Sequence, residues 1–316
     1  MKRNPFEEMR EKMLQSASEG IRQAYSSEEY ALIQAINAYL ETSKSYNLAY
    51  ERLTEWYGIY YPEIRINNPK TLAELTIEMN EGDATLEDVK RIVNNDGMAK
   101  TIFEKSKSSI GRKMNVDEKK AVLGFAQLMV NLSTMISSLE QYIKIASERM
   151  LPNTTYLTDE KIAAELLSKA GSLERLAMMP ASTVQLLGAE KALFKHIKFG
   201  GKPPKYGVLF KMPIVNGAPR DRRGKIARVY ATKICIALKA DYFTHKFIGK
   251  ELKGQLDAIV EKIKNAPATE KKFEERPQQE RRGPPQQRQQ RRGPPQGKFG
   301  NKYNKFHRDG GRPQRR

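Results

Sequence analysis

One stretch near the middle of the chain repeats its apolar residues with a spacing that few folds can accommodate. The spacings alternate between four and three over eight consecutive positions: Phe125, Met129, Leu132, Ile136, Leu139, Ile143, Ala146 and Met150. A 3.5-residue repeat of this length is typical of a coiled-coil seam, in which one helix packs lengthwise on another. An ordinary core helix is the alternative, and the length of the repeat favours the coiled coil. The pattern leaves open whether the seam packs on the same chain, on a second copy, or on both.

Helical spacing of apolar residues is found on both sides of this seam. Two stripes precede it, so residues 1–83 are expected to form a helical segment at the base of the coiled coil. The first stripe is Phe6, Met9, Met13, Ala17, Ile21 and Ala24, and the second is Leu32, Ile36, Tyr39, Tyr46 and Leu48. Residues 84–150 are expected to form the coiled-coil hairpin, with the seam on its second limb. The first limb is interrupted by Asn95-Asp96-Gly97, which predicts a kink or a short loop there.

The remainder of the chain divides into a compact domain and a tail. Short helices separated by glycine turns predict a compact helical domain over 151–265. Beyond it the periodicity stops, and the segment RRGPPQ occurs at 281–286 and again at 291–296. Such a segment buries too little apolar surface to offset its ordering entropy, so residues 266–316 are expected to be a disordered tail. No strand-type alternation exceeds four residues, and the predicted fold class is all-α.

Positive charge is concentrated in two windows of an otherwise near-neutral chain, whose formal net charge is +19. Residues 188–228, called the basic window below, contain eleven Lys or Arg against two Asp or Glu. Residues 276–316 contain thirteen against two. Charge that served only solubility would be spread along the chain. Two concentrated blocks instead predict one folded and one unfolded surface for a polyanion, as in a nucleic-acid-binding protein.

The basic window predicts a shaped surface rather than diffuse charge, the alternative being scattered basic residues that bind nothing. Ser182–Gln185 match a capping box that opens a short helix, which Gly188 would end. In the next helix four lysines follow at offsets 0, 4, 7 and 11, on one face, and the apolar residues left for the core are Ala192, Leu193 and Ile197. Gly224 is expected to open a further helix and to let backbone amides approach a phosphate. The candidate contact residues are Glu190, Lys191, Lys195, Lys198, Lys202, Lys205, Lys211, Arg220, Arg222, Arg223, Lys225 and Arg228.

Other functional classes find little support in the sequence. Three scattered histidines and the single Cys235 do not make a metal site, and Cys235 is expected to be a buried, inert thiol. Gly200-Gly201-Lys202 lacks the other residues of a phosphate-binding loop. There is no secretory signal, and no apolar run approaches the ~20 residues that span a bilayer. We therefore expect a soluble, intracellular, non-catalytic protein that binds no metal or cofactor and no membrane.

Several runs of residues resemble the signature of the Nop domain family. They are Ala181–Phe194, which includes the specific run GAEKALF, then Pro203–Gly207 and Gly224–Arg228. Glu55-Trp56-Tyr57, Tyr61-Pro62-Glu63 and Ser109-Ile110-Gly111 are also similar to the helical region of this family. The likeness extends from about Phe6 to Lys250, and it is strongest to the archaeal members that scaffold box C/D guide-RNA particles.

This resemblance implies a coiled-coil hairpin that pairs two copies of the chain, followed by a Nop domain over 151–265. It also implies that the Nop domain docks on a kink-turn of a box C/D guide RNA already bound by a small ribosomal-protein-like partner. Fibrillarin would then supply ribose 2′-O-methylation with S-adenosylmethionine, while this chain positions the RNA and the methyltransferase. Such a particle is expected to be cytoplasmic in an archaeal-type cell and nucleolar or nuclear in a eukaryote.

The sequence departs from the family pattern in three ways. Family members carry a globular fibrillarin-binding domain before the first helix, whereas few residues precede Phe6 here. We expect either a separate polypeptide to supply that domain, or fibrillarin to be contacted differently or not at all. Lys211-Met212-Pro213 replaces the usual Gln-His-Pro, so base contacts are expected to differ while phosphate attraction survives. The tail is rich in Arg, Gly and Gln rather than in Lys and Glu.

Two other functions remain open at the level of the sequence. A spliceosomal Nop-domain protein would use the same docking on a kink-turn RNA. A coiled-coil structural protein with general nucleic-acid affinity would bind any duplex equally well.

Overall fold

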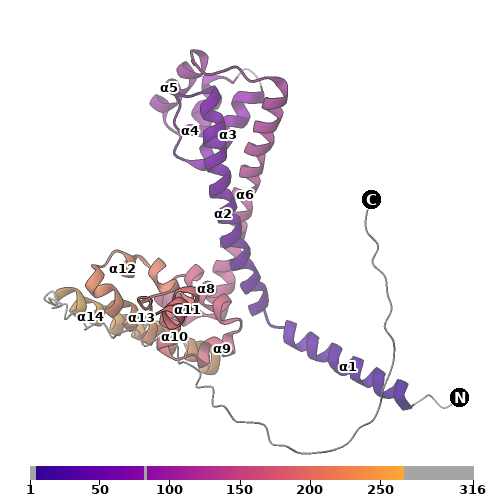
Figure 1. Ribbon diagram of the computed structural model, residues 1–316, viewed down its shortest axis with the longest axis vertical. Coiled ribbons are helices and arrows are strands. Elements are labelled where there is room, and N and C mark those ends of the chain that lie inside the picture. The colour runs from indigo at the N-terminus through magenta and orange to yellow at the C-terminus, as the bar shows by residue number, and fades with distance from the viewer. Residues whose placement is uncertain (1–4, 82–83, 267–316) are drawn as a thin grey trace, which may run out of the picture. The chain divides into compact units, whose positions relative to one another are not determined.

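The computed structural model describes residues 5–81 and 84–266, and within them the chain forms helices and loops only (Figure 1). The all-α prediction is therefore confirmed. The predicted tail lies outside the described residues from 267 onward. The elements in chain order are α1 (Pro5–Tyr25), α2 (Glu29–Tyr60), α3 (Pro69–Glu81), α4 (Leu86–Val93), α5 (Asp96–Lys107), α6 (Val116–Met150), α7 (Pro152–Leu157), α8 (Glu160–Ala170), α9 (Leu173–Met178), α10 (Ala181–Leu186), α11 (Glu190–Phe199), the 3-10 helix η1 (Val208–Lys211), α12 (Pro213–Asn216), α13 (Arg220–Lys239), the π-helical turn η2 (Ala240–Thr244) and α14 (Gly249–Asn265).

The long helices α2 and α6 lie side by side and form the hairpin (Figure 1). All eight seam residues on α6 are buried or half-buried, so the seam is filled within one chain. The partner limb is not the one expected over 84–114, because a 35-residue helix needs a continuous partner and α2 supplies 32 residues. Residues 84–114 cannot do so: Asn94 adopts a left-handed conformation after α4, and Asn95 caps the start of α5.

Local signals in the sequence fix the ends of these two helices. The Asn115 side chain accepts a hydrogen bond from Glu118 N at 2.8 Å, and the Glu118 carboxylate accepts one from Asn115 N at 3.0 Å. This capping box opens α6, and the helix ends just before Pro152. On α2 one position of the predicted apolar stripe is wrong, because Leu48 is 61% exposed and Ala49 is buried in its place.

A first core cluster, the tip cluster, lies where α2 ends and α6 begins. Helix α3 packs there against α6 and α2, α4 packs on α3, and α5 packs on α4. Its buried side chains include Leu53 and Tyr57 of α2, Leu72 of α3, and Val122 and Met129 of α6. The tip cluster therefore joins the segment that the sequence had assigned to the first limb, together with α3, to the ends of α2 and α6.

A second core cluster joins the start of α2 and the end of α6 to the helices that follow, α11 excepted. Helix α13 runs through it with Ile226 and Ile234 fully buried. Asp241, in the π-helical turn η2, is 2% exposed and accepts four hydrogen bonds. They come from the backbone N–H groups of Asn153 and Thr154 at 2.9 and 3.0 Å, and from their side chains at 2.8 and 2.7 Å. A carboxylate far away in sequence thus caps the first turn of α7.

Two further helices bear on earlier expectations. The predicted apolar stripe of α1 is exposed, as at Met9, Met13 and Ile21. Among the described helices, α6 alone is long and apolar enough by length and composition to cross a membrane. Gln127 and Asn131 interrupt its apolar residues, which is why the sequence pattern did not indicate it. A packed helix of a hairpin passes the same test, and the α6 seam is packed on α2.

Candidate nucleic-acid interface

The basic window begins at α10, which opens differently from the prediction. Pro180 is the N-cap residue, no side chain caps this helix, and Ser182 lies inside its first turn. The predicted capping box is therefore wrong. Gln185 is instead buried, and its Nε2 donates to the carbonyl of Lys205 at 2.6 Å. Gly188 ends the segment in a left-handed conformation, as expected of a helix C-terminus.

The loop over 203–207 is fixed to the end of α10 by backbone contacts. Gly207 N donates to Gln185 O at 2.9 Å, and Val208 N donates to Leu187 O at 2.7 Å. A Cβ atom on Gly207 would lie 1.8 Å from Leu187 O, so only glycine allows this close approach. The loop therefore holds Lys205 at a fixed place on the surface.

Helix α11 carries exposed lysines and buries none of its side chains. Lys191, Lys195 and Lys198 lie on the helix, whereas Lys202 follows the left-handed Gly200 that ends it, so only three of the four predicted lysines share the helix. The prediction that Ala192, Leu193 and Ile197 enter the core is wrong. Leu193 is half-buried, the other two are exposed, and Phe194 and Phe199 are exposed as well.

The acidic residue Glu190 has a local structural role at the start of α11. Its carboxylate accepts a hydrogen bond from Gly188 N at 2.6 Å, and a negative charge in a first turn also suits the helix dipole. Farther along, Lys198 Nζ lies 5.8 and 5.5 Å from the ring centroids of Phe194 and Phe199. Exposed ammonium groups and aromatic rings therefore lie next to one another on α11.

Three of the predicted contact residues are used by the fold itself. Lys211 Nζ donates to both oxygens of Glu165, at 2.7 and 2.6 Å, and that carboxylate is largely buried. Arg222 donates to the carbonyls of Lys264 and Ala266, at the end of α14. Arg223 Nε donates to the carbonyl of Ala218 at 2.7 Å. These hydrogen bonds fix η1 to α8 and α13 to α14. Lys211, Arg222 and Arg223 are therefore not among the cations that are free to bind a ligand.

The start of α13 also differs from the expected loop. The helix begins at Arg220, so Gly224 lies in its second turn rather than before it, and its N–H belongs to the hydrogen-bonding pattern of the helix. The close approach of Gly224 to a phosphate is therefore not available. Its missing side chain instead leaves space beside Lys205, whose Cδ lies 3.9 Å from where a Cβ would be. Lys205 is thus brought next to α13.

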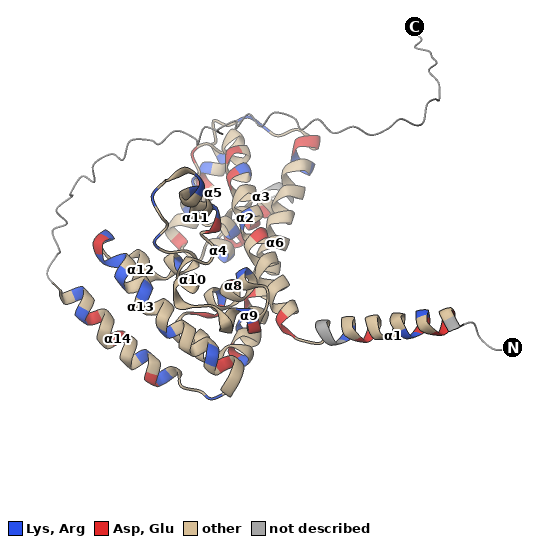
Figure 2. Cartoon of the chain, turned by 60° about the horizontal axis from the view of Figure 1, so that its bottom comes forward, with Lys and Arg blue, Asp and Glu red and all other residues tan. Residues whose placement is uncertain are grey.

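The remaining cations form the candidate interface. Within the described residues they are exposed, and no ion pair or hydrogen bond engages their side chains. Figure 2 shows Lys and Arg gathered at the N-terminal end of α13. The set is Lys191, Lys195, Lys198, Lys202, Lys205, Arg220, Lys225 and Arg228. Both acids of the basic window have local partners. Glu190 accepts a hydrogen bond from Gly188 N, and Asp221 lies 3.6 Å from Arg222. The surface can therefore attract phosphates through at least two separate elements.

Chemistry other than charge attraction has little support at this interface. Among the described residues no group of His, Cys, Asp and Glu could hold a metal ion. The His196 ring nitrogen Nδ1 is engaged by the carbonyl of Gly201. Cys235 is half-buried rather than buried, and its thiol lies 3.3 Å from the carbonyl of Met179. Both side chains thus contribute to the local structure.

Comparison with known proteins now identifies the fold family. Residues 38–262 match the family model described as "Nop: snoRNA binding domain, fibrillarin". The chain belongs to the Nop family. The matched region begins in α2 and ends in α14, so it contains the hairpin, the tip cluster and the basic window. The resemblance drawn from the GAEKALF run is therefore confirmed.

Relatives in the Nop family are found in archaea and eukaryotes. A NOP5 family protein from Methanocaldococcus jannaschii is 35% identical over 268 residues, which are 83% of this chain and 64% of that protein. Nucleolar protein 56 is 34% identical over 251 residues in Dictyostelium discoideum and over 237 in Homo sapiens. These cover 76% and 72% of this chain, and 46% and 40% of the relatives. The chain thus spans between two fifths and two thirds of the relatives' lengths.

Among solved structures, the chain is similar to one in a crystal structure of a fibrillarin/Nop5p complex. The sequence identity is 24%, the TM-score is 0.46, and the match covers 82% of this chain and 78% of that one.

Proposed function

We propose that this Nop-family chain is an RNA-binding scaffold of a box C/D guide-RNA ribonucleoprotein. It binds a kink-turn of the guide RNA and helps to position a fibrillarin-type methyltransferase for ribose 2′-O-methylation. The chain has no catalytic role in this proposal, because the methyl transfer belongs to fibrillarin. Fibrillarin is reached either directly or through a further polypeptide. The particle would be cytoplasmic in an archaeal-type cell and nucleolar in a eukaryote.

The observation that carries this proposal is the set of unpaired cations on α11 and at the start of α13. Lysines on one helix face repel one another, so the arrangement costs stability unless an anion occupies it. A polyphosphate backbone matches that need, since most protein hydrogen bonds to nucleic acids go to phosphate and sugar. These cations lie on helices and on the fixed loop over 203–207, so we expect them to favour an RNA of a particular shape over any duplex.

The exposed apolar side chains of α11 support a second partner at the same surface. Phe194, Ile197 and Phe199 lie beside the lysines, and Ile197 is 73% exposed. Such side chains suit a contact with protein, whereas the ammonium groups suit RNA. We therefore propose that α11 contacts two partners simultaneously: the kink-turn and the small ribosomal-protein-like protein that is bound to the kink-turn.

We also propose that two copies pair through the outer face of the hairpin. Leu128, Met135 and Tyr142 are spaced by seven residues on α6 and remain exposed although the seam is already filled by α2. This second apolar row is what a further helix would need. In sedimentation experiments, Leu128→Lys with Met135→Lys should convert a dimer into a monomer without loss of helix content. A wild-type monomer at micromolar concentration would contradict the pairing.

The function is tested by assembly on a kink-turn RNA with and without the ribosomal-protein-like partner. We expect the partner to increase the affinity strongly, and Lys191→Glu with Lys195→Glu to reduce assembly by well over tenfold and to flatten its salt dependence. The matched control is Lys239→Glu with Lys250→Glu, which changes the same charge at exposed positions outside the basic window. Equal losses in both variants, or equal affinity for any duplex, would contradict the proposal.

A further inference from the structure

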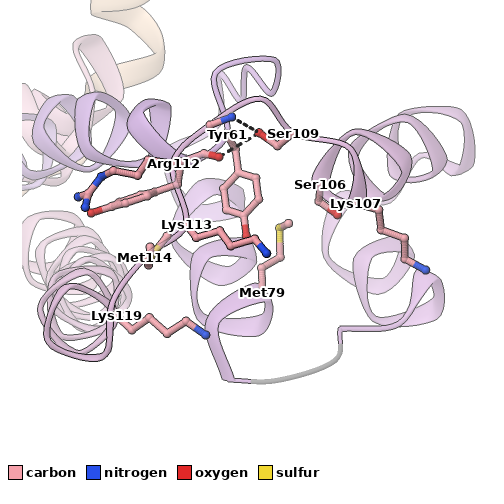
Figure 3. A pocket seen from close by; sticks show the side chains of 11 residues that line it. Tyr61, Met79, Ser106, Lys107, Ser109, Arg112, Lys113, Met114 and Lys119 are labelled. Carbon is pink, nitrogen blue, oxygen red and sulfur yellow. Dashed lines mark hydrogen bonds between the residues drawn. The ribbon is translucent and has the colours of Figure 1, made fainter.

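A pocket of about 340 Å³ opens in the tip cluster, at the end of the hairpin remote from the basic window. We call it the tip pocket. It lies where α2 ends, α5 ends and α6 begins, and Figure 3 shows the side chains that line it. Those that matter for its chemistry are Tyr61, Met79, Arg112, Lys113, Met114 and Lys119.

The loop that carries Arg112 and Lys113 is fixed before any ligand arrives. Ser109 Oγ lies 3.0 Å from the carbonyl of Tyr60 and 2.8 Å from Glu63 Oε2, and it accepts a hydrogen bond from Gly111 N (Figure 3). A Cβ on Gly111 would lie 2.0 Å from the Tyr60 carbonyl oxygen, so glycine is required there. A pocket built this way loses little conformational entropy on binding.

Two unpaired ammonium groups face the interior of the pocket. Figure 3 shows Lys113 extending toward Tyr61 and Met79, and Lys119 reaching in from α6. Neither lysine forms an ion pair with any described residue. At the sides, Arg112 is paired with Glu118, and Lys107 lies over the ring of Phe103 at 4.2 Å. Like charges that face one space are unfavourable together, and a bound anion removes that cost.

The Tyr61 side chain adds a flat wall and a hydrogen-bond donor. Burial raises the pKa of its hydroxyl, so the group stays protonated at neutral pH and can donate to an oxygen. Unpaired bases stack on aromatic rings of this kind, and their phosphates pair with nearby cations. An acidic side chain would pair with the lysines but would not stack on the Tyr61 ring. A nucleotide would do both.

We propose that the tip pocket binds one nucleotide of an unpaired RNA strand, with its phosphate between Lys113 and Lys119 and its base on Tyr61. The inference rests on the proposed RNA-binding function and adds a second RNA contact. Because α2 is about 48 Å long, this contact would engage RNA far from the kink-turn. The hairpin would then set a distance between two RNA segments as well as join two parts of the chain.

The test uses the full chain with ¹³C-labelled methionine methyl groups and follows three ligands by NMR. Met79 and Met114 line the tip pocket, whereas Met212 is buried within the basic window and reports separately on it. Single-stranded hexanucleotide RNA is expected to shift the signals of Met79 and Met114 at lower concentration than adenosine monophosphate does. A glutamate hexapeptide is expected to leave both signals in place.

Adjacent lysines supply the matched variants. Lys119→Glu should raise the RNA concentration that half-shifts the Met79 and Met114 signals by about tenfold or more. Lys120 is exposed at the next helical position but lies outside the pocket, so Lys120→Glu should change that concentration by less than about twofold. Both lysines lie in the first turns of α6, where a glutamate is well tolerated, so both variants should fold. Equal effects of the two variants, or a hexapeptide that binds as tightly as RNA, would overturn the proposal. Equal affinity for the mononucleotide and the RNA would assign the pocket to free nucleotides instead. Shifts at Met212 without shifts at Met79 and Met114 would refute the tip contact and leave the proposed function standing.

Discussion

Gly207→Ala should detach the 203–207 loop from α10 and weaken both the fold and the RNA surface. The added Cβ would lie 1.8 Å from Leu187 O and 2.7–2.8 Å from the carbonyl carbons of Leu187 and Leu186. These are backbone atoms, so neither can rotate away as a flexible side chain would. The two segments must therefore separate by about 1 Å or more.

The separation breaks three hydrogen bonds: Gly207 N to Gln185 O, Val208 N to Leu187 O, and Gln185 Nε2 to Lys205 O. Each contributes about 0.5–1.5 kcal/mol and the overpacking about 1–3 kcal/mol, so we expect a loss of about 2.5–7.5 kcal/mol in the free energy of unfolding. Urea unfolding followed by circular dichroism measures it. RNA assembly should fall roughly fivefold or more, because Lys205 loses its fixed place.

Gly201→Ala is the matched control for this prediction. Gly201 lies in the same basic window, it has no positive φ, and a Cβ there would meet no atom within 4 Å. We expect its effect on stability to stay within about 0.5 kcal/mol. If Gly207→Ala unfolds at the same urea concentration as the wild type, the loop is not held by the close approach described above. The assignment of Lys205 to a fixed surface would then fail with it.

Three further predictions concern the fold and the tip. Asp241→Ala leaves four buried donors without an acceptor and should lower the free energy of unfolding by about 3–5 kcal/mol, against less than about 0.5 for the exposed Asp257→Ala, both by urea titration. The hydrogen bond from Ile110 N lowers the pKa of Glu63, so the stabilisation of the tip loop is present above the unfolded pKa of Glu63 and is lost as pH falls through the folded pKa. The protection factor of the Ile110 amide, taken against its intrinsic exchange rate at each pH, should therefore fall in acid, and Glu63→Gln should remove that pH dependence; an unchanged profile would refute it. Lys211→Ala should destabilise the chain by about 1–3 kcal/mol while leaving the salt dependence of RNA binding unchanged, since its partner carboxylate is largely buried.

The hairpin shows what a hydrophobic repeat can and cannot predict. The period of the seam identified α6 and the residues of its packed face, because that periodicity is local to one helix. It held no information about the partner, since any helix with a complementary face satisfies the same repeat. The continuous partner, α2, was separated from α6 by the three short helices of the tip cluster. Only the tertiary packing decides between α2 and the interrupted segment before Asn115.

The basic window shows the same limit for charge. Its family signature was readable because the GAEKALF run is specific, and the net charge was a matter of counting. The uses of single residues were not readable. Arg222 caps the end of α14, some forty positions away in sequence, and Lys211 pairs with Glu165 on α8. Likewise Ile197 looked like a core residue because its spacing was helical, although α11 packs no side chain into the core.

These reassignments set an upper bound on how strongly the folded surface responds to salt. Eight cations of the basic window remain unpaired, and each phosphate contact contributes about 0.7–0.9 to the slope of log affinity against log salt. The folded surface can therefore supply a slope of about 6–7 at most, and fewer contacts lower it in proportion. A chain truncated after residue 266 should stay below this bound with a kink-turn RNA, and residues 276–316 should raise the slope when present. A steeper slope in the truncated chain would require further cations, and Lys119→Glu would show whether the tip pocket provides them.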